Sequence, residues 1–173
     1  KWKWKENYLP EINDQKIFNK HKIPLLSEAL NTWSNVYFNI EPKSEESAYL
    51  LLDELKKQKD LNRFCVGSYK SENLNIMREG LMNKICPSMS QDEVIKFFIN
   101  RFLPFFNNNV PCLQIPMYFY CVQIVTRNLV NYVHSTGKKI HVWTINDESE
   151  MQTLIDYGVD GIMTDRPKKL KEV

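Results

Sequence analysis

The sequence predicts an α/β fold in which short buried strands alternate with longer amphipathic helices. The chain has 173 residues, of which 43% are hydrophobic and 25% are charged, and this length suits one domain with a substantial core. After residue 23, short apolar runs alternate with segments whose apolar residues recur at helical spacing. The sequence contains no internal repeat and no long linker. Alternation of this kind predicts a parallel sheet covered by helices.

About six short apolar runs are expected to be strands. They are residues 36–40, 64–66, 84–86, 112–115, 140–144 and 161–164. A parallel sheet of this size is either a doubly wound open sheet or part of a (β/α)₈ barrel. No G-x-G-x-x-G or G-x-x-x-x-G-K-[ST] fingerprint is present, which favours the barrel. The chain is nevertheless short for a complete barrel, which typically needs about 250 residues.

The helix expected over residues 46–59 has the clearest pattern, with apolar residues on one face and charged residues on the other. Ser44 is expected to be its N-cap, followed by two acidic residues that suit the helix dipole. The same reasoning predicts serine N-caps for the next two helices, glycine C-caps for two later helices and a proline at the start of the last helix. These boundary residues are Ser71, Ser90, Gly137, Gly158 and Pro167.

Residues 94–110 form an unusually aromatic segment that also contains Lys96 and Arg101. We expect a strongly apolar helix here, ended by Pro104 and the turn at residues 107–109. One interpretation is a helix that packs on the sheet. The alternative is contact with a membrane, because aromatic residues with flanking basic residues suit a membrane interface.

Charge and composition exclude several classes of partner. A net charge of +2 with scattered lysines argues against nucleic acid. There is no apolar run long enough for a transmembrane helix and no recognisable signal peptide. The first residue is not Met, so Lys1–Lys5 is expected to begin a processed or truncated product.

The four cysteines match no zinc or redox spacing. Each lies in or beside an apolar stretch, so we expect buried free thiols in a reducing compartment. A disulfide stays open as the alternative. The cysteines are Cys65, Cys86, Cys112 and Cys121.

Glu41 and Lys43 are the first candidate site residues. They follow the strand expected at 36–40, are two apart, and should project to the same face. Polar residues at the carboxyl end of a parallel strand line the mouth of a barrel, where chemistry occurs. A carboxylate suits a hard divalent cation and a lysine suits a phosphate oxygen. The alternative is a plain solvated turn.

Two later strands end in further candidates. Trp143 stands near the carboxyl end of the strand expected at 140–144, where an indole can wall a pocket. Asp165 and Arg166 follow the last expected strand, and they either pair, contact a ligand or form a capping turn.

Taken together, these stretches resemble the C-terminal portion of the glycerophosphodiester phosphodiesterase family. The order and spacing of four motifs carry the resemblance, and the last is the most specific. They are residues 23–30, 39–43, 141–146 and 158–167. The aromatic segment and residues 113–117 look most like the small membrane-associated eukaryotic members, which include lysophospholipase D enzymes. The resemblance makes residues 1–22 an N-terminal extension or linker remnant and 23–173 the C-terminal part of the barrel.

The resemblance implies a partial (β/α)₈ TIM barrel with about six C-terminal strands and their helices. It implies metal-dependent hydrolysis of glycerophosphodiesters or lysophospholipids, with Mg²⁺ or Ca²⁺ as the divalent metal. By motif, Glu41 matches a metal-ligand carboxylate of the family. Lys43 matches the basic residue near the substrate phosphate, and Trp143 the aromatic residue that lines the pocket.

The sequence departs from the family at its first strands. The family's His-Arg-Gly, Glu-x-Asp and His-Asp motifs are absent, so we expect no catalytic residue in this chain. His21, His134 and His141 lie in other contexts and are expected to be structural or solvated.

Two function classes therefore stay open. In the first, another polypeptide, or the uncut N-terminal part of the same gene product, supplies the N-terminal barrel strands and completes a working phosphodiesterase. In the second, the chain is a catalytically inactive barrel remnant that serves as a structural subunit of a larger assembly. We expect an intracellular location, with membrane association and an organelle as the options left open.

Overall fold

The computed structural model describes residues 24–82, 84–103 and 109–173. The chain divides into two units, Lys1–Val36 and Tyr37–Val173. The described part of the first unit contains one helix, α2 (Leu26–Thr32). The Glu28 carboxylate accepts a hydrogen bond from the Leu25 amide at 2.9 Å, which satisfies a free donor at the start of this helix. The predicted extension at residues 1–22 lies outside the described residues.

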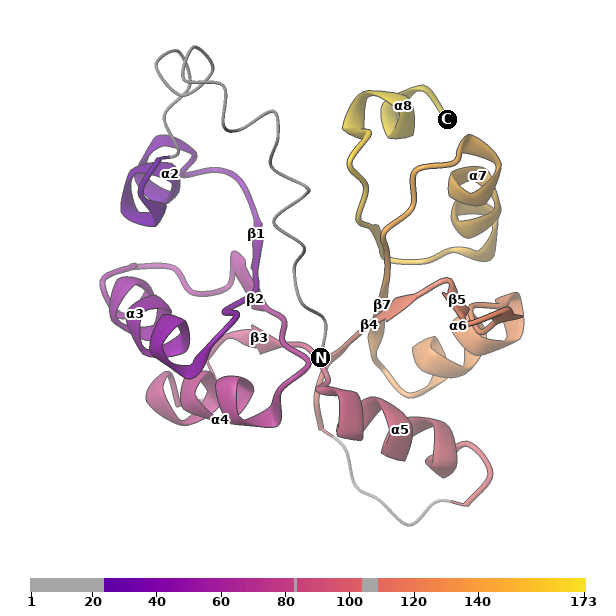
Figure 1. The fold of residues 1–173 in the computed structure, drawn as a ribbon, viewed down its shortest axis with the longest axis horizontal. Coiled ribbons are helices and arrows are strands. Elements are labelled where there is room, and N and C mark those ends of the chain that lie inside the picture. The colour runs from indigo at the N-terminus through magenta and orange to yellow at the C-terminus, as the bar shows by residue number, and fades with distance from the viewer. Residues whose placement is uncertain (1–23, 83, 104–108) are drawn as a thin grey trace. The chain divides into compact units, whose positions relative to one another are not determined.

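The second unit alternates strands and helices as predicted (Figure 1). Its strands are β1 (Phe38–Ile40), β2 (Phe64–Val66), β3 (Cys86–Pro87), β4 (Cys112–Pro116), β5 (Tyr118–Phe119), β6 (Val122–Gln123), β7 (Lys139–Trp143) and β8 (Gly161–Ile162). Its helices are α3 (Glu45–Lys56), α4 (Ser71–Gly80), α5 (Gln91–Asn100), α6 (Arg127–Ser135), α7 (Glu148–Tyr157) and α8 (Pro167–Glu172). Each predicted strand is present, and the predicted α/β class is confirmed. The hairpin β5–β6 was not predicted.

The strands form two parallel sheets and one antiparallel hairpin. The sheet orders are β1-β2-β3 and β4-β7-β8, and β5 pairs with β6. One isolated parallel bridge, Ser88 with Cys112, connects β3 to β4, where the Met89 amide donates to the Cys112 carbonyl at 2.8 Å. The described strands do not form one continuous ladder, so the partial barrel stays a prediction.

The main hydrophobic core lies between the second sheet and helices α5, α6 and α7. Alternate residues of β4 and β7 point into it, because side chains on a strand alternate between its faces. These are Leu113, Ile115, Ile140 and Val142, each at most 2% exposed. Burial of each such side chain stabilises the fold by about 1.5–3 kcal/mol. The opposite face of the same strands carries the polar side chains of Gln114 and His141 together with Cys112 and Trp143.

Several predicted helix boundaries are confirmed. The Ser44 hydroxyl accepts a hydrogen bond from the Ser47 amide at 3.1 Å. Ser90 is the N-cap of α5, and Glu93 accepts a hydrogen bond from its amide at 2.8 Å. Gly158 ends α7 with a φ of 79°, a left-handed conformation that glycine adopts readily. Pro167 begins α8, and Gly137 follows the last turn of α6 with a positive φ.

Two helix predictions were wrong in their bounds. Ser71 is the first residue of α4 rather than its cap, because its hydroxyl donates to Asp92 at 2.5 Å. The helix predicted to begin at Glu46 begins at Glu45 and ends at Lys56 instead of Lys59.

The aromatic segment also differs from its prediction. The helix α5 runs Gln91–Asn100, beginning earlier than residue 94 because of the capping box at Ser90 and ending well before residue 110. Residues 104–108 lie outside the described residues. Phe97 is 3% exposed and joins the core, which confirms the interpretation of a helix packed on the sheet. Phe102 and Leu103, just beyond α5, are exposed.

All four cysteines are free thiols. Cys112 is buried, and Cys65 and Cys86 are partly buried on adjacent strands. Hydrogen bonds with Cys112 and Cys86, together with burial, raise the pKa of the Cys65 thiol. Cys121 is exposed, so the prediction of burial was wrong there, because this residue lies in the turn of the β5–β6 hairpin.

Across the described ranges, no helix is long and apolar enough to cross a membrane.

Candidate functional site

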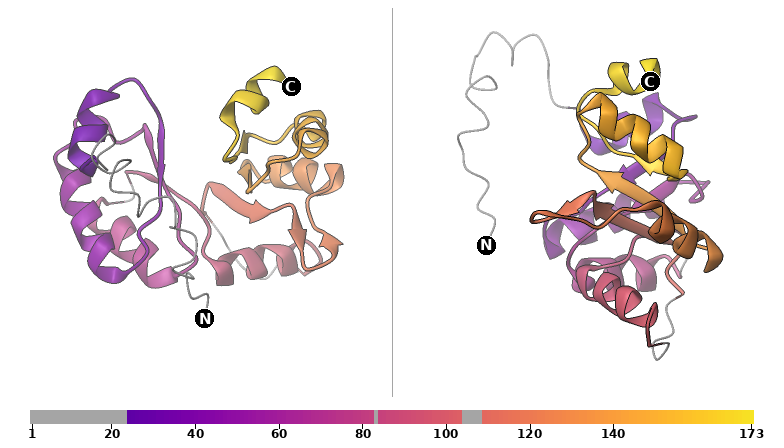
Figure 2. Two further views of the ribbon diagram at one scale, coloured as in Figure 1. Left: turned by 45° about the horizontal axis from the view of Figure 1, so that its top comes forward. Right: turned by 90° about the vertical axis from the view of Figure 1, so that its right-hand side faces the viewer.

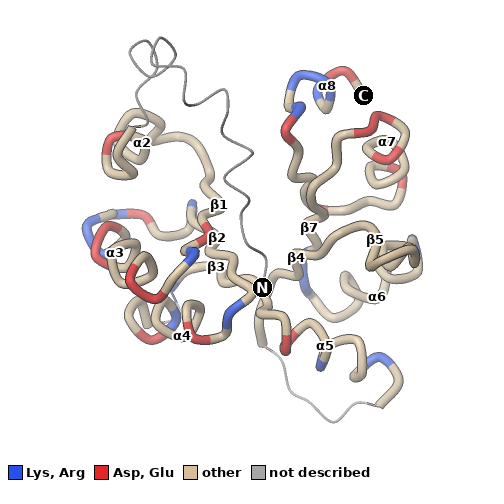
Figure 3. Tube along the Cα trace, viewed as in Figure 1, with Lys and Arg blue, Asp and Glu red and all other residues tan. Residues whose placement is uncertain are grey.

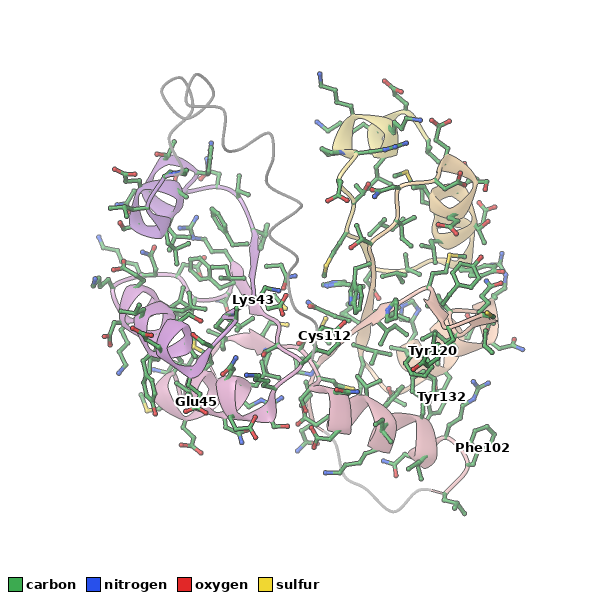
Figure 4. All side chains as sticks on the ribbon, in the orientation of Figure 1. Lys43, Glu45, Phe102, Cys112, Tyr120 and Tyr132 are labelled. Carbon is green, nitrogen blue, oxygen red and sulfur yellow. The ribbon has the colours of Figure 1, made fainter. Side chains whose placement is uncertain are left out.

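Glu41 and Lys43 come together directly after β1. The Lys43 ammonium lies 2.6 Å from a Glu41 carboxylate oxygen, with side chains 61% and 38% exposed respectively. The predicted shared face is therefore observed, and Figure 4 labels Lys43 just past the end of β1. An exposed ion pair of this kind contributes little to stability. The ion pair instead holds a carboxylate and an ammonium side by side at the carboxyl end of a parallel strand.

A buried asparagine from α4 holds the backbone between these two residues. Asn73 is 1% exposed, and its amide nitrogen donates to the Pro42 carbonyl at 3.0 Å and to the Ser68 hydroxyl at 3.3 Å. Pro42 is itself buried, while its neighbours Glu41 and Lys43 face solvent. Asn73 therefore fixes the segment that presents the ion pair. Sequence reasoning missed this residue, because its partners lie 31 and 5 residues away.

Trp143 is the last residue of β7 and meets a second aromatic residue that sequence reasoning also missed. Its ring packs edge-on against Tyr69, with centroids 5.7 Å apart and planes at 88°. Tyr69 follows β2 and is 53% exposed. Burial, and then the negative charge of Glu41, raise the pKa of the Tyr69 hydroxyl. The structure thus brings Glu41, Lys43, Tyr69 and Trp143 to the carboxyl ends of β1, β2 and β7.

The loops after β7 and β8 are joined by Asn146. Its amide nitrogen donates to an Asp165 carboxylate oxygen at 2.9 Å, and its amide oxygen accepts from the Asp165 amide at 2.9 Å. The Thr164 hydroxyl also donates to Asn146 and accepts from the Arg166 amide at 2.9 Å. Arg166 is the residue that caps α8. The Asp165 carboxylate bonds to Asn146, and Arg166 makes no side-chain cap hydrogen bond, so a ligand contact and a capping turn both stay predictions for these two residues.

The polar face of the sheets carries its own hydrogen-bond network. The Gln114 amide donates to the Asn39 side-chain oxygen at 3.0 Å and lies 3.4 Å from the His141 Nδ1. Cys112 Sγ lies 3.5 Å from the same nitrogen. Burial lowers the pKa of His141, which favours its neutral form. His141 therefore has structural partners, as predicted.

The second described histidine is also tied to the fold. His134 Nε2 lies 2.8 Å from an Asp160 carboxylate oxygen, and Asp160 also accepts from the Ile140 amide at 2.9 Å. Asp160 lies directly before β8, so these two contacts join it to the end of α6 and to the start of β7. The prediction for His21 falls outside the described residues.

The described residues alone do not fit a tight cation site. Within residues 24–82, 84–103 and 109–173, no three histidine, cysteine, aspartate or glutamate side chains gather so as to hold a metal ion. Glu41 offers a carboxylate, but Lys43 already contacts it. Magnesium and calcium take about six or more oxygen ligands. Ligands beyond those described would have to complete the site.

A shallow hollow of about 340 Å³ lies beside Tyr69, over the first turns of α4 and α5. Its polar side chains bond to one another, since Asp92 accepts from both the Ser71 and Ser90 hydroxyls. These hydrogen bonds lower the pKa of Asp92. Ser71 and Asp92 in this hollow are therefore bonded within the protein, and they connect the first turns of α4 and α5.

The fold and this cluster define a class of protein: an α/β chain with an acidic, a basic and an aromatic residue at the carboxyl ends of its parallel strands, where such folds place their chemistry. The model of the Glycerophosphoryl diester phosphodiesterase family matches residues 2–169. The chain belongs to this family.

Named relatives agree with the family. The chain is 25% identical over 157 residues to "Probable glycerophosphodiester phosphodiesterase 2" of Mycobacterium tuberculosis, covering 87% of this chain and 60% of that protein. It is 23% identical over 185 residues to lysophospholipase D GDPD1 of Homo sapiens, covering 88% of this chain and 56% of that protein. The chain therefore spans little more than half the length of these relatives.

Solved structures agree in fold. A phosphodiesterase of Oleispira antarctica in complex with the product sn-glycerol-3-phosphate superposes with a TM-score of 0.64 and 23% identity, over 87% of this chain and 60% of that one. The glycerophosphodiester phosphodiesterase of Thermotoga maritima gives a TM-score of 0.61 and 22% identity, over 93% and 68% respectively. At these identities the likeness concerns the fold alone.

Proposed function

We propose that this chain supplies part of an active site for metal-dependent hydrolysis of glycerophosphodiesters or lysophospholipids. The observation that carries the proposal is the contact of Glu41 with Lys43 at the end of β1, beside the Tyr69–Trp143 aromatic pair. Family membership supports the reaction class, and the names of the relatives support the two substrate classes.

Each residue of the cluster has a role that its chemistry suits. Glu41 offers a carboxylate oxygen to a divalent cation, Mg²⁺ or Ca²⁺, which would supply polarisation of the phosphoryl oxygens when bound. Lys43 offers an ammonium to the phosphate of the substrate. Its contact with Glu41 keeps the ammonium within reach of the same position. Trp143, backed by Tyr69, forms an apolar wall beside the site.

The rest of the site has to come from elsewhere. The family's histidine motifs are absent from the sequence, and the described histidines are held by structural partners. Within the described sheets, β1 pairs only with β2 and β8 only with β7, so each has one edge without a strand partner. Such edges favour pairing with further strands. A polypeptide that carries the N-terminal barrel strands would pair with both edges and complete a (β/α)₈ barrel.

A second candidate function is structural and requires no active site. The main core and the helix caps are formed without any contribution from Glu41, Lys43 or Trp143. A catalytically inactive remnant could therefore keep this fold and act as a structural subunit of a larger assembly.

The remaining expectations from the sequence stay predictions. These are membrane contact through residues 94–110, the absence of a nucleic-acid partner, and an intracellular location.

The two functions are separated by identifying what the chain binds in its natural setting. Purification under native conditions, followed by intact mass measurement and peptide sequencing, will show which polypeptides accompany this chain. The phosphodiesterase proposal expects strands with His-Arg-Gly, Glu-x-Asp and His-Asp, on a companion or on the same longer polypeptide. Companions without these motifs would favour the structural subunit.

A further inference from the structure

The hairpin β5–β6 follows the carboxyl end of β4, and the candidate site residues also follow the carboxyl ends of their strands. It begins two residues after Pro116, the last residue of β4, and Pro116 is paired in register with Trp143. The hairpin follows β4 in the orange part of the ribbon in Figure 2. Tyr118 pairs with Gln123 and Phe119 with Val122, which leaves Tyr120 and Cys121 as the turn. The hairpin therefore extends from the carboxyl end of β4, beside the residue that forms the apolar wall of the site.

The hairpin presents an apolar surface to solvent. We call the side chains of Tyr118, Phe119, Tyr120 and Val122 the hairpin surface; their exposed fractions are 43%, 60%, 90% and 65%. No residue from 115 to 126 is Lys, Arg, Asp or Glu, and β5 carries no charge colour in Figure 3. Contiguous exposed apolar side chains of this kind mark an interaction site more often than an ordinary surface.

The turn residue is unfavourable for folding. Tyr120 has a φ of 52°, a conformation that glycine and asparagine adopt far more readily than a bulky residue. Its ring packs on Phe119, with centroids 4.8 Å apart, and is otherwise exposed (Figure 4). Glycine or asparagine would form this turn with less strain. The aromatic ring at this position therefore suits contact with something outside the chain.

We propose that the hairpin surface contacts the uncharged surface of a zwitterionic phospholipid layer and brings its lipid to the phosphodiester site. Tyrosine rings combine an apolar body with a polar hydroxyl and are enriched at membrane–water interfaces. The absence of charge suits zwitterionic headgroups rather than anionic ones. The lipid class rests on the proposed function, because a lipid phosphodiester is the substrate proposed for Glu41 and Lys43, and the hairpin follows a parallel strand at its carboxyl end, as those two residues do.

The exposed residues that follow α5 form a separate surface. A helix between two parallel strands runs back from the carboxyl end of the first strand to the amino end of the next. Phe102 and Leu103 follow α5 and precede β4, whereas the hairpin follows β4. The two surfaces therefore lie at opposite ends of the strands. Substitutions on one surface can serve as the control for equivalent substitutions on the other.

The test is cosedimentation of the chain with phosphatidylcholine vesicles that contain lysophosphatidylcholine, without added metal. The double variant Phe119→Ser/Tyr120→Ser removes two exposed rings and is expected to weaken binding by at least about tenfold. The control, Phe102→Ser/Leu103→Ser, also removes two exposed apolar side chains and is expected to bind as the unchanged chain does.

A single substitution separates lipid contact from a role in folding. Tyr120→Asn suits the positive φ, so it is expected to leave the thermal midpoint unchanged or raise it, while vesicle binding falls. A lower midpoint would mean that the ring packs within the fold, and the proposal would be wrong.

Three other outcomes would overturn the proposal. One is an unchanged chain that does not sediment with vesicles. Another is loss of binding in the Phe102→Ser/Leu103→Ser variant alone, which would assign the contact to residues 94–110. The third is a hairpin variant that changes only the oligomeric state, which would make a second copy the occupant. None of these measurements uses hydrolysis, so failure of the proposed reaction would leave the result interpretable.

Discussion

Replacement of Asn73 should destabilise the second unit and loosen the segment that presents Glu41 and Lys43. Asn73→Ala removes the hydrogen bonds to the Pro42 carbonyl at 3.0 Å and to the Ser68 hydroxyl at 3.3 Å. Each is worth about 0.5–1.5 kcal/mol, and a buried carbonyl left without a donor adds to the loss. We expect the free energy of unfolding to fall by about 2 kcal/mol.

Asn73→Asp is expected to cost more than Asn73→Ala near neutral pH. The substitution keeps the shape but replaces a donor with a carboxylate oxygen, which would face the Pro42 carbonyl. Urea unfolding followed by circular dichroism measures both changes, and a loss of about 2 kcal/mol moves the midpoint by roughly 1 M.

The control for these variants is Asn131→Ala, at an exposed position on α6. We expect this change to stay within about 0.5 kcal/mol of the unchanged chain. If both Asn73 variants unfold at the same urea concentration as Asn131→Ala, the reasoning about Asn73 is wrong.

Two further predictions concern pH and backbone conformation. Burial opposes the charged form of Glu93, but hydrogen bonds from Arg78 and the Ser90 amide hold its pKa below the ordinary 4.5. Since the folded-state pKa is the lower one, the stabilisation by ionised Glu93 is present above pH 4.5 and is lost as the pH falls further. Glu93→Gln should cost about 1–2 kcal/mol at neutral pH and flatten the acid side of the stability profile; an unchanged acid slope would argue against this contribution. Gly158→Ala should cost about 1 kcal/mol, because φ is 79° and a Cβ there would meet nothing within 4 Å, leaving backbone strain as the cause. Thermal unfolding of Gly158→Ala beside Gly158→Asn checks this, and equal stability of alanine and asparagine would contradict it.

Features fixed by local sequence were predicted well. The strands and most caps depend on short apolar runs and on the residue types Ser, Gly and Pro, as at Ser44, Gly158 and Pro167. The shared face of Glu41 and Lys43 was predicted from their spacing of two residues, although both residues lie after β1 and not within it.

Features fixed by distant contacts could not be predicted in this way. Asn73 and Tyr69 gain their positions from residues on other elements. The β5–β6 hairpin was missed because its turn is Tyr120-Cys121, without the glycine or asparagine that marks such turns. Ser71 looked like a helix cap, but its hydroxyl bonds to Asp92 on the next helix.

The central claim is that Glu41 belongs to a phosphodiesterase site that this chain shares with further strands. The most direct measurement is metal-dependent release of choline from lysophosphatidylcholine and glycerophosphocholine by the natural assembly or longer polypeptide that contains this chain. Glu41→Gln removes one carboxylate charge, and Glu45→Gln is the matched control on the first turn of α3. The account predicts that hydrolysis falls by at least about a hundredfold in Glu41→Gln, since metal-site electrostatics contribute several kcal/mol to such reactions, and that it is unchanged in Glu45→Gln. Equal hydrolysis by both variants, or none by the unchanged assembly with Mg²⁺ or Ca²⁺, would contradict it.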